Sequence, residues 1–354
     1  MDGAVLRTGA DGAAPRVEPA KVIRRLRPAG VAAGARLTRV AVPGHALALT
    51  APALQLAEQR LVALVGNKVD VVETIAAYLV EAGGKRLRPM MVALGAGAVG
   101  YTGPLDGLMC AGELIHLGSL LHDDVVDLGL LRRGRPSAPV VYGNAASILT
   151  GDFCLARAVL LAAEEGGHRA VTALAAAVTS MAEGEVLQLQ QAGDLNTSRA
   201  LHLDMVDRKS AALLSWCAAA GAYTLEDEHS AEALARFGRA VGIAFQITDD
   251  VLDYLPETGK MPGADLRERK VTLPLIHAMA ARPELRARLA RAAPEPDELP
   301  ALIEEVRATG ALDLTLDEAR ARVADAQEAL DGLPDGPHRR ALAELSLYLV
   351  ERCV

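Results

Sequence analysis

Two short segments of the sequence carry the same unusual arrangement of acidic residues. One reads LLHDDVVDLGL, the other reads FQITDDVLDY, and their first aspartates are 126 positions apart (249 − 123). The acids are Asp123, Asp124 and Asp127 in the first segment and Asp249, Asp250 and Asp253 in the second. Most of their neighbours are aliphatic, and an ionised carboxylate in apolar surroundings is unstable unless a cation or a hydrogen-bond donor compensates it. The natural solution is a fold in which two helices bring the segments face to face around cations.

The rest of the chain is predicted to be helical. Only 3% of the residues are aromatic although 51% are hydrophobic, a composition that suits helices better than strands. Apolar residues recur at intervals of three and four between Gly, Pro, Asn and Asp clusters. The predicted helices cover residues 54–82, 89–99, 105–128, 144–165, 169–192, 199–222, 229–255, 271–281, 296–308, 313–331 and 336–351. Several are apolar on more than one face, which indicates a single-domain, all-α bundle.

The first 45 residues differ from the remainder. They are rich in Ala, Gly, Pro and Arg and contain eight Lys+Arg against three Asp+Glu, which leaves −13 for the rest of the chain (−8 − 5). They have no apolar centre of the kind that a signal peptide needs. A transit peptide is conceivable, but Asp2 and Asp11 fit it poorly. We expect a disordered basic tail over residues 1–45, followed by one domain over residues 46–354.

Charge and composition also exclude several classes of protein. The net charge of −8 argues against a nucleic-acid-binding face. The four cysteines are far apart in the sequence and are interpreted as thiols in a reducing compartment, not as a disulfide or zinc framework. Glu113 and His116 interrupt the longest apolar run, so no transmembrane segment is predicted. We therefore expect a cytoplasmic protein.

The clustered acids predict a metal site. Carboxylates this close together repel one another and raise one another's pKa unless a multivalent cation neutralises them. Mg²⁺ prefers carboxylate, water and phosphate oxygens and usually shares its shell with a substrate phosphate. A solvated acidic patch is the simpler alternative, and the aliphatic neighbours argue against it. We expect magnesium ions between the two segments and a phosphorylated ligand that completes their shells.

Two groups of basic residues lie near the predicted metal ligands. They are Lys85, Arg86 and Arg88 in GGKRLRP, and Arg132, Arg133 and Arg135 in RRGRP. A glycine-led loop before a helix can aim side-chain cations and backbone amides at one anion. We predict that these groups form a diphosphate clamp, and we interpret Arg86 and Arg135 as ordinary surface charges.

These motifs, together with ELIHLGSLLHDDVVD, GDFCLARA, DRKSAALL and GADLRERKVTLPL, occur in the order typical of trans-isoprenyl (polyprenyl) diphosphate synthases. The chain resembles that family from about Leu54 to the C-terminus. The resemblance implies an all-α bundle around a central cavity, Mg²⁺ as cofactor, and a homodimer. It also implies isopentenyl diphosphate and an allylic diphosphate as substrates.

The resemblance assigns a role to each matching residue. The first three aspartates would bind Mg²⁺ on the allylic diphosphate, and Asp249 and Asp250 would bind a further Mg²⁺ with Asp253 as support. The isopentenyl diphosphate would be held by Lys85, Arg88, His116 and Arg133. The allylic diphosphate would be contacted by Arg132, Lys209, Ser210 and Lys260, with Gln246 near the leaving group. Ser210 stands where the family usually has Thr, and Lys270 is an alternative to Lys260 because the segment YLPETGKMPGADL is shorter than the commoner form.

Product length is predicted from the residues that precede the first aspartate. In the family, bulky aromatic residues four and five positions before it give short products. Here those positions are Ser119 and Gly118, and further up the helix Ile115, Leu114 and Ala111 follow, without an aromatic residue. We therefore expect an all-trans product longer than farnesyl and geranylgeranyl diphosphate, of the kind used for quinone side chains and destined for a membrane. A floor supplied by another helix, for example by Phe153, would instead give a shorter product.

Several other functions are compatible with parts of the sequence. A shorter-chain synthase is the nearest, and a non-catalytic subunit of a heteromeric synthase would be expected to lose residues that this chain retains. The His122–Asp123 pair suggests a metal phosphohydrolase, in which the second acidic segment would have no role. A terpene cyclase would need no second diphosphate site, and the residues Lys85, Arg88, His116 and Arg133 argue against it.

Overall fold

The computed structural model describes residues 43–66, 69–81, 83–84, 86–255, 262–291 and 294–351. Its elements are α2 (Gly44–Val65), α3 (Asp70–Glu81), α4 (Leu87–Ala98), α5 (Asp106–Val126), β1 (Leu131–Arg132), β2 (Arg135–Pro136), α6 (Ala138–Tyr142), α7 (Asn144–Gln190), α8 (Arg199–Val206), the π-helical segment η1 (Asp207–Ala211), α9 (Ala212–Tyr223), α10 (Glu228–Leu252), α11 (Ala264–Arg267), α12 (Leu273–Ala281), α13 (Pro283–Arg291), α14 (Leu299–Arg307), α15 (Ala311–Ala329) and α16 (Pro337–Glu351). Apart from one short antiparallel hairpin, the described residues contain no strand, and the predicted all-α class is confirmed.

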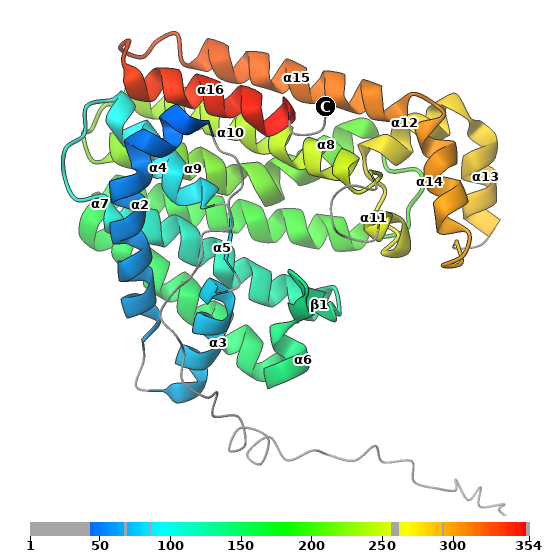
Figure 1. Cartoon of the computed structure of the whole chain (residues 1–354), viewed down its shortest axis with the longest axis horizontal. Helices are drawn as coiled ribbons and strands as arrows, with labels where there is room; N and C mark the ends of the chain where they lie inside the picture. The colour runs from blue at the N-terminus through cyan, green and yellow to red at the C-terminus, as the bar shows by residue number, and fades with distance from the viewer. Residues whose placement is uncertain are drawn as a thin grey trace, which may run out of the picture.

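Long helices form the centre of the molecule. α5 packs along α7, α9 packs between α4 and α10, and α10 also contacts α15. Figure 1 shows α15 and α16 lying over this centre, with α2 along one side and α3, α6 and the hairpin together at one end. The two helices that carry the acidic segments, α5 and α10, therefore belong to the packed interior and are held from several sides.

Small residues allow the central helices to approach closely. A Cβ atom added at Gly95 of α4 would lie 2.0 Å from the carbonyl oxygen of Ala218 in α9. A Cβ atom added at Gly238 of α10 would lie 2.4 Å from the carbonyl oxygen of Leu214. α9 is buried almost all round, as its even distribution of apolar residues predicts. The many Ala and Gly residues thus allow the backbones of neighbouring helices to come into direct contact, so that the interior is densely packed.

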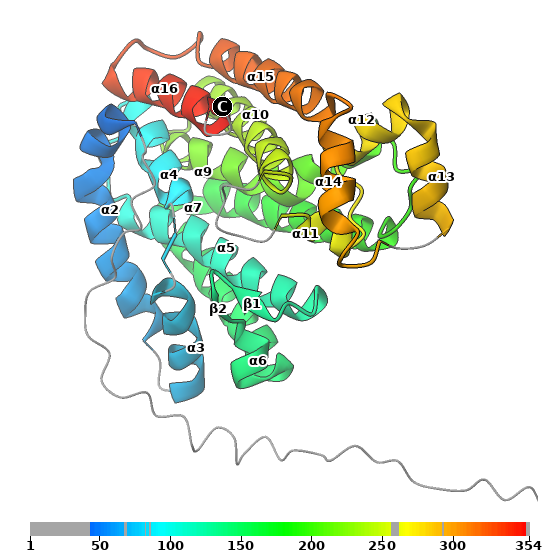
Figure 2. The ribbon, with the colours of Figure 1, turned by 45° about the vertical axis from the view of Figure 1, so that its right-hand side comes forward.

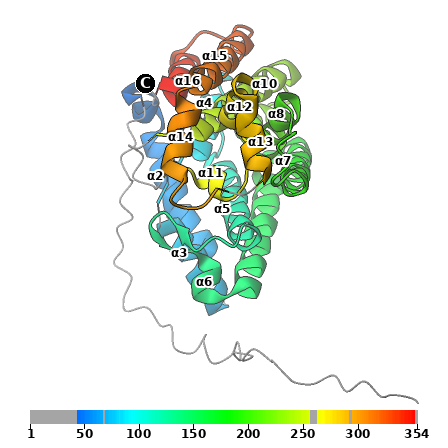
Figure 3. The same cartoon turned by 90° about the vertical axis from the view of Figure 1, so that its right-hand side faces the viewer.

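A second group of helices has its own apolar core. α12, α13 and α14 lie together at one end of the molecule (Figures 2 and 3). Their core includes Leu275, Leu285 and Val306, and it continues to Tyr254, which directly follows the second acidic segment. The backbone amide of Gly263 donates to the carbonyl oxygen of Asp253 over 2.7 Å. This group therefore fixes the end of α10 where the acids lie.

The helix boundaries agree with the predictions except at a few points. The predicted helix 54–82 is two helices, α2 and α3, and α2 begins at Gly44. The predicted helices 144–165 and 169–192 form one element, α7, which is broken at Gly167, where φ is +72° and ψ is −171°. Glycine tolerates this conformation because it lacks a Cβ atom. The hairpin and the helices α6, α11 and α13 were not predicted.

Residues 1–42 lie outside the described part of the chain, so the expected tail stays a prediction, although Gly44 and His45 already belong to α2.

Cys110, Cys154 and Cys217 are free and buried, and burial raises the pKa of each thiol to about 12. Among the described helices, α7 alone is long and apolar enough to cross a membrane by length and composition. Core helices pass the same test, so the absence of a transmembrane segment stays a prediction too.

Candidate active site

A large cavity opens between the central helices. It has a volume of about 1270 Å³ and is lined from α4, α5, the hairpin, α7, η1, α9, α10 and α11. Of the predicted site residues, those that line it are Arg88, Ile115, His116, Ser119, Asp123, Arg132, Arg133, Lys209, Ser210, Gln246, Asp249, Asp250 and Asp253. Asp124, Asp127 and Gly118 do not line it. Lys85 and Lys260 lie outside the described residues.

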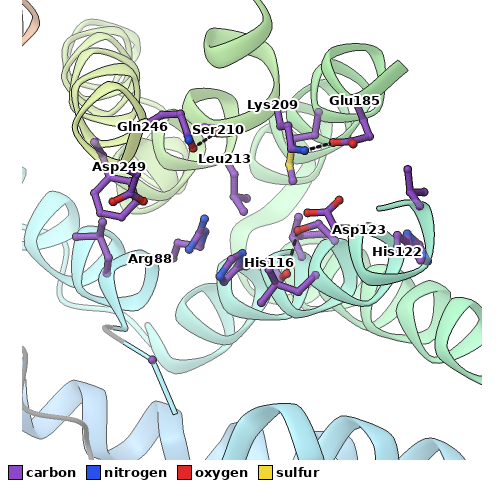
Figure 4. Close-up of a pocket in the computed structure, with 18 of the residues that line it drawn as sticks. Arg88, His116, His122, Asp123, Glu185, Lys209, Ser210, Leu213, Gln246 and Asp249 are labelled. Atoms are coloured by element: carbon purple, nitrogen blue, oxygen red, sulfur yellow. Dashed lines mark hydrogen bonds and ion pairs between the residues drawn. The ribbon is translucent and has the colours of Figure 1, made fainter. Parts of the chain in front are cut away.

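The first aspartate of each acidic segment faces this cavity. Asp123 on α5 and Asp249 on α10 belong to different walls, and Arg88 and His116 lie between them in the view of Figure 4. Burial raises the pKa of Asp123, and the charges of Glu185 and Asp127 add to the effect while Lys209 opposes it. A cation placed here would relieve this repulsion.

The other acids of the first segment are turned away from the cavity. Asp124 is 2% exposed, and its Oδ1 accepts hydrogen bonds from Nε of Arg132 at 2.7 Å and from Nη2 at 2.6 Å. Its Oδ2 is buried and accepts no hydrogen bond from the described residues. Asp127 ends α5 and forms an ion pair with Lys270 at 3.3 Å. Arg132 is therefore held beside the cavity by an acid of the same segment.

The second segment is held by hydrogen bonds. Asp253 accepts from the backbone amides of Ala264 at 3.0 Å and Asp265 at 2.9 Å, so it caps the start of α11. Asp250 is 4% exposed and accepts from the side-chain amide of Gln246 at 3.1 Å. Gln246 in turn accepts from the hydroxyl of Ser210 at 2.8 Å, as Figure 4 shows. All three acids line the cavity, and Figure 4 shows Asp249 on its α10 wall.

A cationic group lies on the α4 side of the cavity. Arg88, Arg133 and His116 line the same stretch of wall, and burial followed by the charges of Arg88 and Arg133 holds the pKa of His116 well below its usual value. Burial also lowers the pKa of Arg88, whose Nε has no hydrogen-bond partner in the part of the chain that is described. Gly84 leaves room for Arg133, because a Cβ atom there would lie 3.2 Å from its Nη2. Cations this crowded, with donors unused, favour a bound anion.

The interpretation of Arg86 as a surface charge is wrong. Arg86 is 6% exposed, and its guanidinium donates to Glu113 at 2.7 Å and to Glu58 at 3.1 Å. Its backbone is left-handed, with φ of +48°. These two ion pairs hold the strained residue and so position the loop that precedes Arg88. Arg135, in contrast, lies on the surface, 6.0 Å from the ring centre of Tyr78.

Three residues near the site were missed by the sequence analysis. Glu185 on α7 forms an ion pair with Lys209 (Figure 4), Glu113 holds Arg86, and His202 contacts Asp250. Lys209 and Ser210 lie in the π-helical segment η1, a distortion that is frequent at functional sites. An acid or histidine in an apolar helical run was the available signal for all three.

The apolar part of the cavity is built differently from the prediction. Ile115 and Ser119 line it, together with Leu155, Val178 and Met181 of α7. Gly118 instead faces α7, where a Cβ atom would lie 3.0 Å from the carbonyl oxygen of Gly151. Phe153 does not line the cavity, whereas Phe245 of α10 does. A role of Gly118 in product length would therefore act through helix packing, and that of Ile115 and Ser119 stays a prediction.

The donor set fits Mg²⁺ that shares its shell with a ligand. No group of three or more His, Cys, Asp or Glu side chains that could hold a metal alone occurs among the described residues. Asp123 and Asp249 are nevertheless cavity-facing carboxylates, and Oδ2 of Asp124 lacks a protein partner within the described ranges. Separate carboxylates that leave positions for substrate oxygens are what Mg²⁺ usually finds in proteins.

Comparison with known proteins agrees with this geometry. A profile of the family described as polyprenyl synthetase matches residues 69–308. An octaprenyl diphosphate synthase of Haemophilus influenzae is 38% identical over 314 residues, which is 86% of this chain and 95% of that protein. The crystal structure of a decaprenyl diphosphate synthase from Rhodobacter capsulatus has a TM-score of 0.82 at 38% identity and covers 87% of this chain and 98% of that one.

A polyprenyl synthase from Caulobacter crescentus, crystallised with calcium and isoprenyl diphosphate, has a TM-score of 0.83 at 37% identity, with 88% of this chain and 98% of that chain covered. The fold and the site therefore define an all-helical prenyltransferase. Within that class, the chain belongs to the polyprenyl synthetase family.

Proposed function

We propose that the protein condenses isopentenyl diphosphate with an allylic diphosphate to make a long-chain, all-trans polyprenyl diphosphate. The observation that carries this proposal is one cavity with Asp123 and Asp249 on two walls, a cationic group at Arg88 and Arg133, and apolar side chains beyond them. The names of the relatives, an octaprenyl and a decaprenyl diphosphate synthase, support a long product.

Magnesium is proposed as the cofactor. Asp123 and Asp249 would hold it, and Asp124 and Asp127 would join them once Arg132 and Lys270 move to the substrate. Bound there, Mg²⁺ supplies charge neutralisation for the departing diphosphate. The calcium in the related polyprenyl synthase of Caulobacter crescentus supports a divalent ion in this fold.

The side chains of this protein bind and orient both substrates. Lys209 and Arg132 lie beside Asp123 and are placed to contact the allylic diphosphate, where negative charge develops as its C1–O bond breaks. The double bond of isopentenyl diphosphate then forms a bond to C1. The proton that leaves goes to the departing diphosphate, and the product is one five-carbon unit longer.

The second diphosphate site distinguishes a synthase from a cyclase. Arg88 and Arg133, with His116 beside them, form an anion-binding group that an enzyme with one diphosphate substrate does not need. We assign isopentenyl diphosphate to this group. His116 is neutral here, because burial and two arginines keep its pKa low, so it binds by hydrogen bonding and not by charge.

The remaining assignments belong to the same proposal. The protein is proposed to act as a homodimer in the cytoplasm and to make the side chain of a quinone, a product that leaves for a membrane. A shorter product remains the nearest alternative, because Phe245 lines the cavity and is its one aromatic wall residue among the described positions.

A single assay tests the function. The purified full-length chain is incubated with Mg²⁺, radiolabelled isopentenyl diphosphate and allylic primers of increasing length, and the alcohols are sized after dephosphorylation. Products longer than twenty carbons support the proposal. Label that stops at fifteen or twenty carbons supports the short-chain alternative, and absence of any elongation by this chain alone contradicts the proposal.

A further inference from the structure

Asp250 is a buried carboxylate in acidic surroundings. It is 4% exposed and follows Asp249 directly, and Asp265 borders the same small cavity behind it. An ionised carboxylate in such a place is stable only if donors satisfy its oxygens. The donors that hold Asp250 therefore decide whether the second acidic segment keeps its shape.

Each oxygen of Asp250 has a different donor. Oδ1 accepts from the amide of Gln246 at 3.1 Å, one turn earlier on α10. Oδ2 lies 3.1 Å from Nε2 of His202, which is 5% exposed and comes from α8. Because a carboxylate only accepts, the imidazole must carry its proton on Nε2. The His202 bond is thus the link that ties the acid to a different helix.

The position of α8 makes this link significant. α8 runs directly into η1, which carries Lys209 and Ser210, and Ser210 donates to Gln246 at 2.8 Å. Asp250 is therefore held from both ends of one continuous α8–η1 segment. A shift of Asp250 would also move its neighbour Asp249, which lines the main cavity with it.

We propose that His202 is a positioning residue for the cation site, acting through Asp250. This inference rests on the proposed function. His202 does not line the main cavity. Its hydrogen bond fixes the side-chain orientation of Asp250 and the register of the second acidic segment. Partners that orient metal-binding carboxylates typically contribute 10- to 100-fold to metal affinity or activity.

The experiment compares His202→Met with His202→Gln in the full-length protein. The two replacements are nearly equal in size, and only glutamine can donate a hydrogen bond from about the position of Nε2. A smaller residue would enlarge the adjoining cavity of about 160 Å³ and admit water, which could replace the bond. Binding of Mn²⁺ in the presence of inorganic diphosphate is measured by electron paramagnetic resonance.

We expect His202→Met to bind Mn²⁺ about 10- to 100-fold more weakly than the wild type, and His202→Gln to retain most of the affinity. In an Asp250→Asn background, His202→Met should add no further loss. Equal binding by wild type and His202→Met, or an additional loss in the Asp250→Asn background, overturns the inference.

Two readouts keep the result interpretable. If His202→Met fails to fold, as judged by circular dichroism, ¹⁵N-histidine NMR of the wild type decides, because a ring protonated on Nδ1 alone contradicts the inference. Chain elongation by the wild type is scored separately. If the wild type does not elongate a primer, the proposed function fails, while the comparison of metal binding still tests the role of His202.

Discussion

Glu185 of α7 and Lys209 of η1 form an ion pair on the wall of the cavity, although 24 positions separate them in the sequence (209 − 185). Gly184 makes this possible, because a Cβ atom there would lie 2.7 Å from the backbone nitrogen of Lys209. The lysine that we assign to the allylic diphosphate is thus held by an acid on the neighbouring helix.

Replacing Glu185 should strengthen anion binding. In Glu185→Gln the diphosphate no longer competes with a carboxylate for Lys209. We expect up to about fivefold tighter binding of inorganic diphosphate, equivalent to ~1 kcal/mol for a partly exposed ion pair. Isothermal titration calorimetry measures it. Glu183→Gln, which loses an exposed ion pair with Arg208, is the matched control, and weaker binding by Glu185→Gln would show that Glu185 has another role.

The first aspartate of each segment should be essential. Asp123→Asn and Asp249→Asn each remove a carboxylate that lines the cavity, and we expect kcat to fall at least 10²- to 10³-fold, the usual loss for one group that stabilises developing charge. Incorporation of labelled isopentenyl diphosphate measures it. Asp204→Asn, an acid on α8 paired with Arg208, should retain wild-type turnover. Turnover that survives in either aspartate variant contradicts the assignment of the cation site.

Product length should respond to Ser119 and not to Gly118. Ser119→Phe places a ring in the cavity, so we expect shorter products, sized after dephosphorylation. Gly118→Phe would force apart α5 and α7 at Gly151, and overpacking of this kind costs about 1–3 kcal/mol or more. We therefore expect Gly118→Phe to lower the midpoint of thermal unfolding. Unchanged product length in Ser119→Phe would place the floor of the cavity elsewhere.

Arg86 should stabilise the fold more than a surface arginine does. Arg86→Met leaves Glu113 buried without its partner, and breaking a buried ion pair costs about 3–5 kcal/mol. Urea unfolding measures the free energy. Arg135→Met, at the surface, is the control and should change it by less than about 0.5 kcal/mol. The double variant Arg86→Met with Glu113→Gln should recover part of the loss, and equal stability of Arg86→Met and wild type would contradict the burial of this pair.

His116 should make stability depend on pH. Its pKa is held well below 6.5 in the folded protein, mainly by burial. Below pH 6.5 the unfolded chain binds a proton that the folded chain does not, so the free energy of unfolding falls as the pH falls. The slope reaches about 1.4 kcal/mol per pH unit for one proton. Urea unfolding between pH 7.5 and 5.5 should show a shallower slope for His116→Gln, and identical slopes would contradict the low pKa.

The sequence predicts most of the fold because helices in a bundle have strong periodic patterns. It fails where tertiary contacts override local pattern. Gly167 interrupts α7 without ending it, and Asp124 turns inward because Arg132 is there to receive it. Gly118 was expected to set product length because it lies five residues before Asp123. The sequence did not show that this position faces α7 and not the cavity.

The residues that support the site could not be predicted from the sequence for the same reason. The sequence places Arg86 in a loop, where an arginine is usually a surface charge. Only the fold brings Glu113 and Glu58 to it. His202 is 48 positions from Asp250, and its place in an apolar helical run does not identify that partner. The residues that we assign to the substrates form recognisable motifs, whereas the residues that position them do not.

Lys270 and Asp127 join stretches of chain 143 positions apart. A cation that takes the Oδ2 of Asp127 as a ligand would separate this pair, and the ammonium of Lys270 would then be free to contact the oxygens that arrive with the cation. If Asp127 is a metal ligand, as we propose, the carboxylate that pairs with Lys270 would also hold the cation. High ionic strength, which weakens this partly exposed ion pair, should therefore make Asp127 more available to a cation.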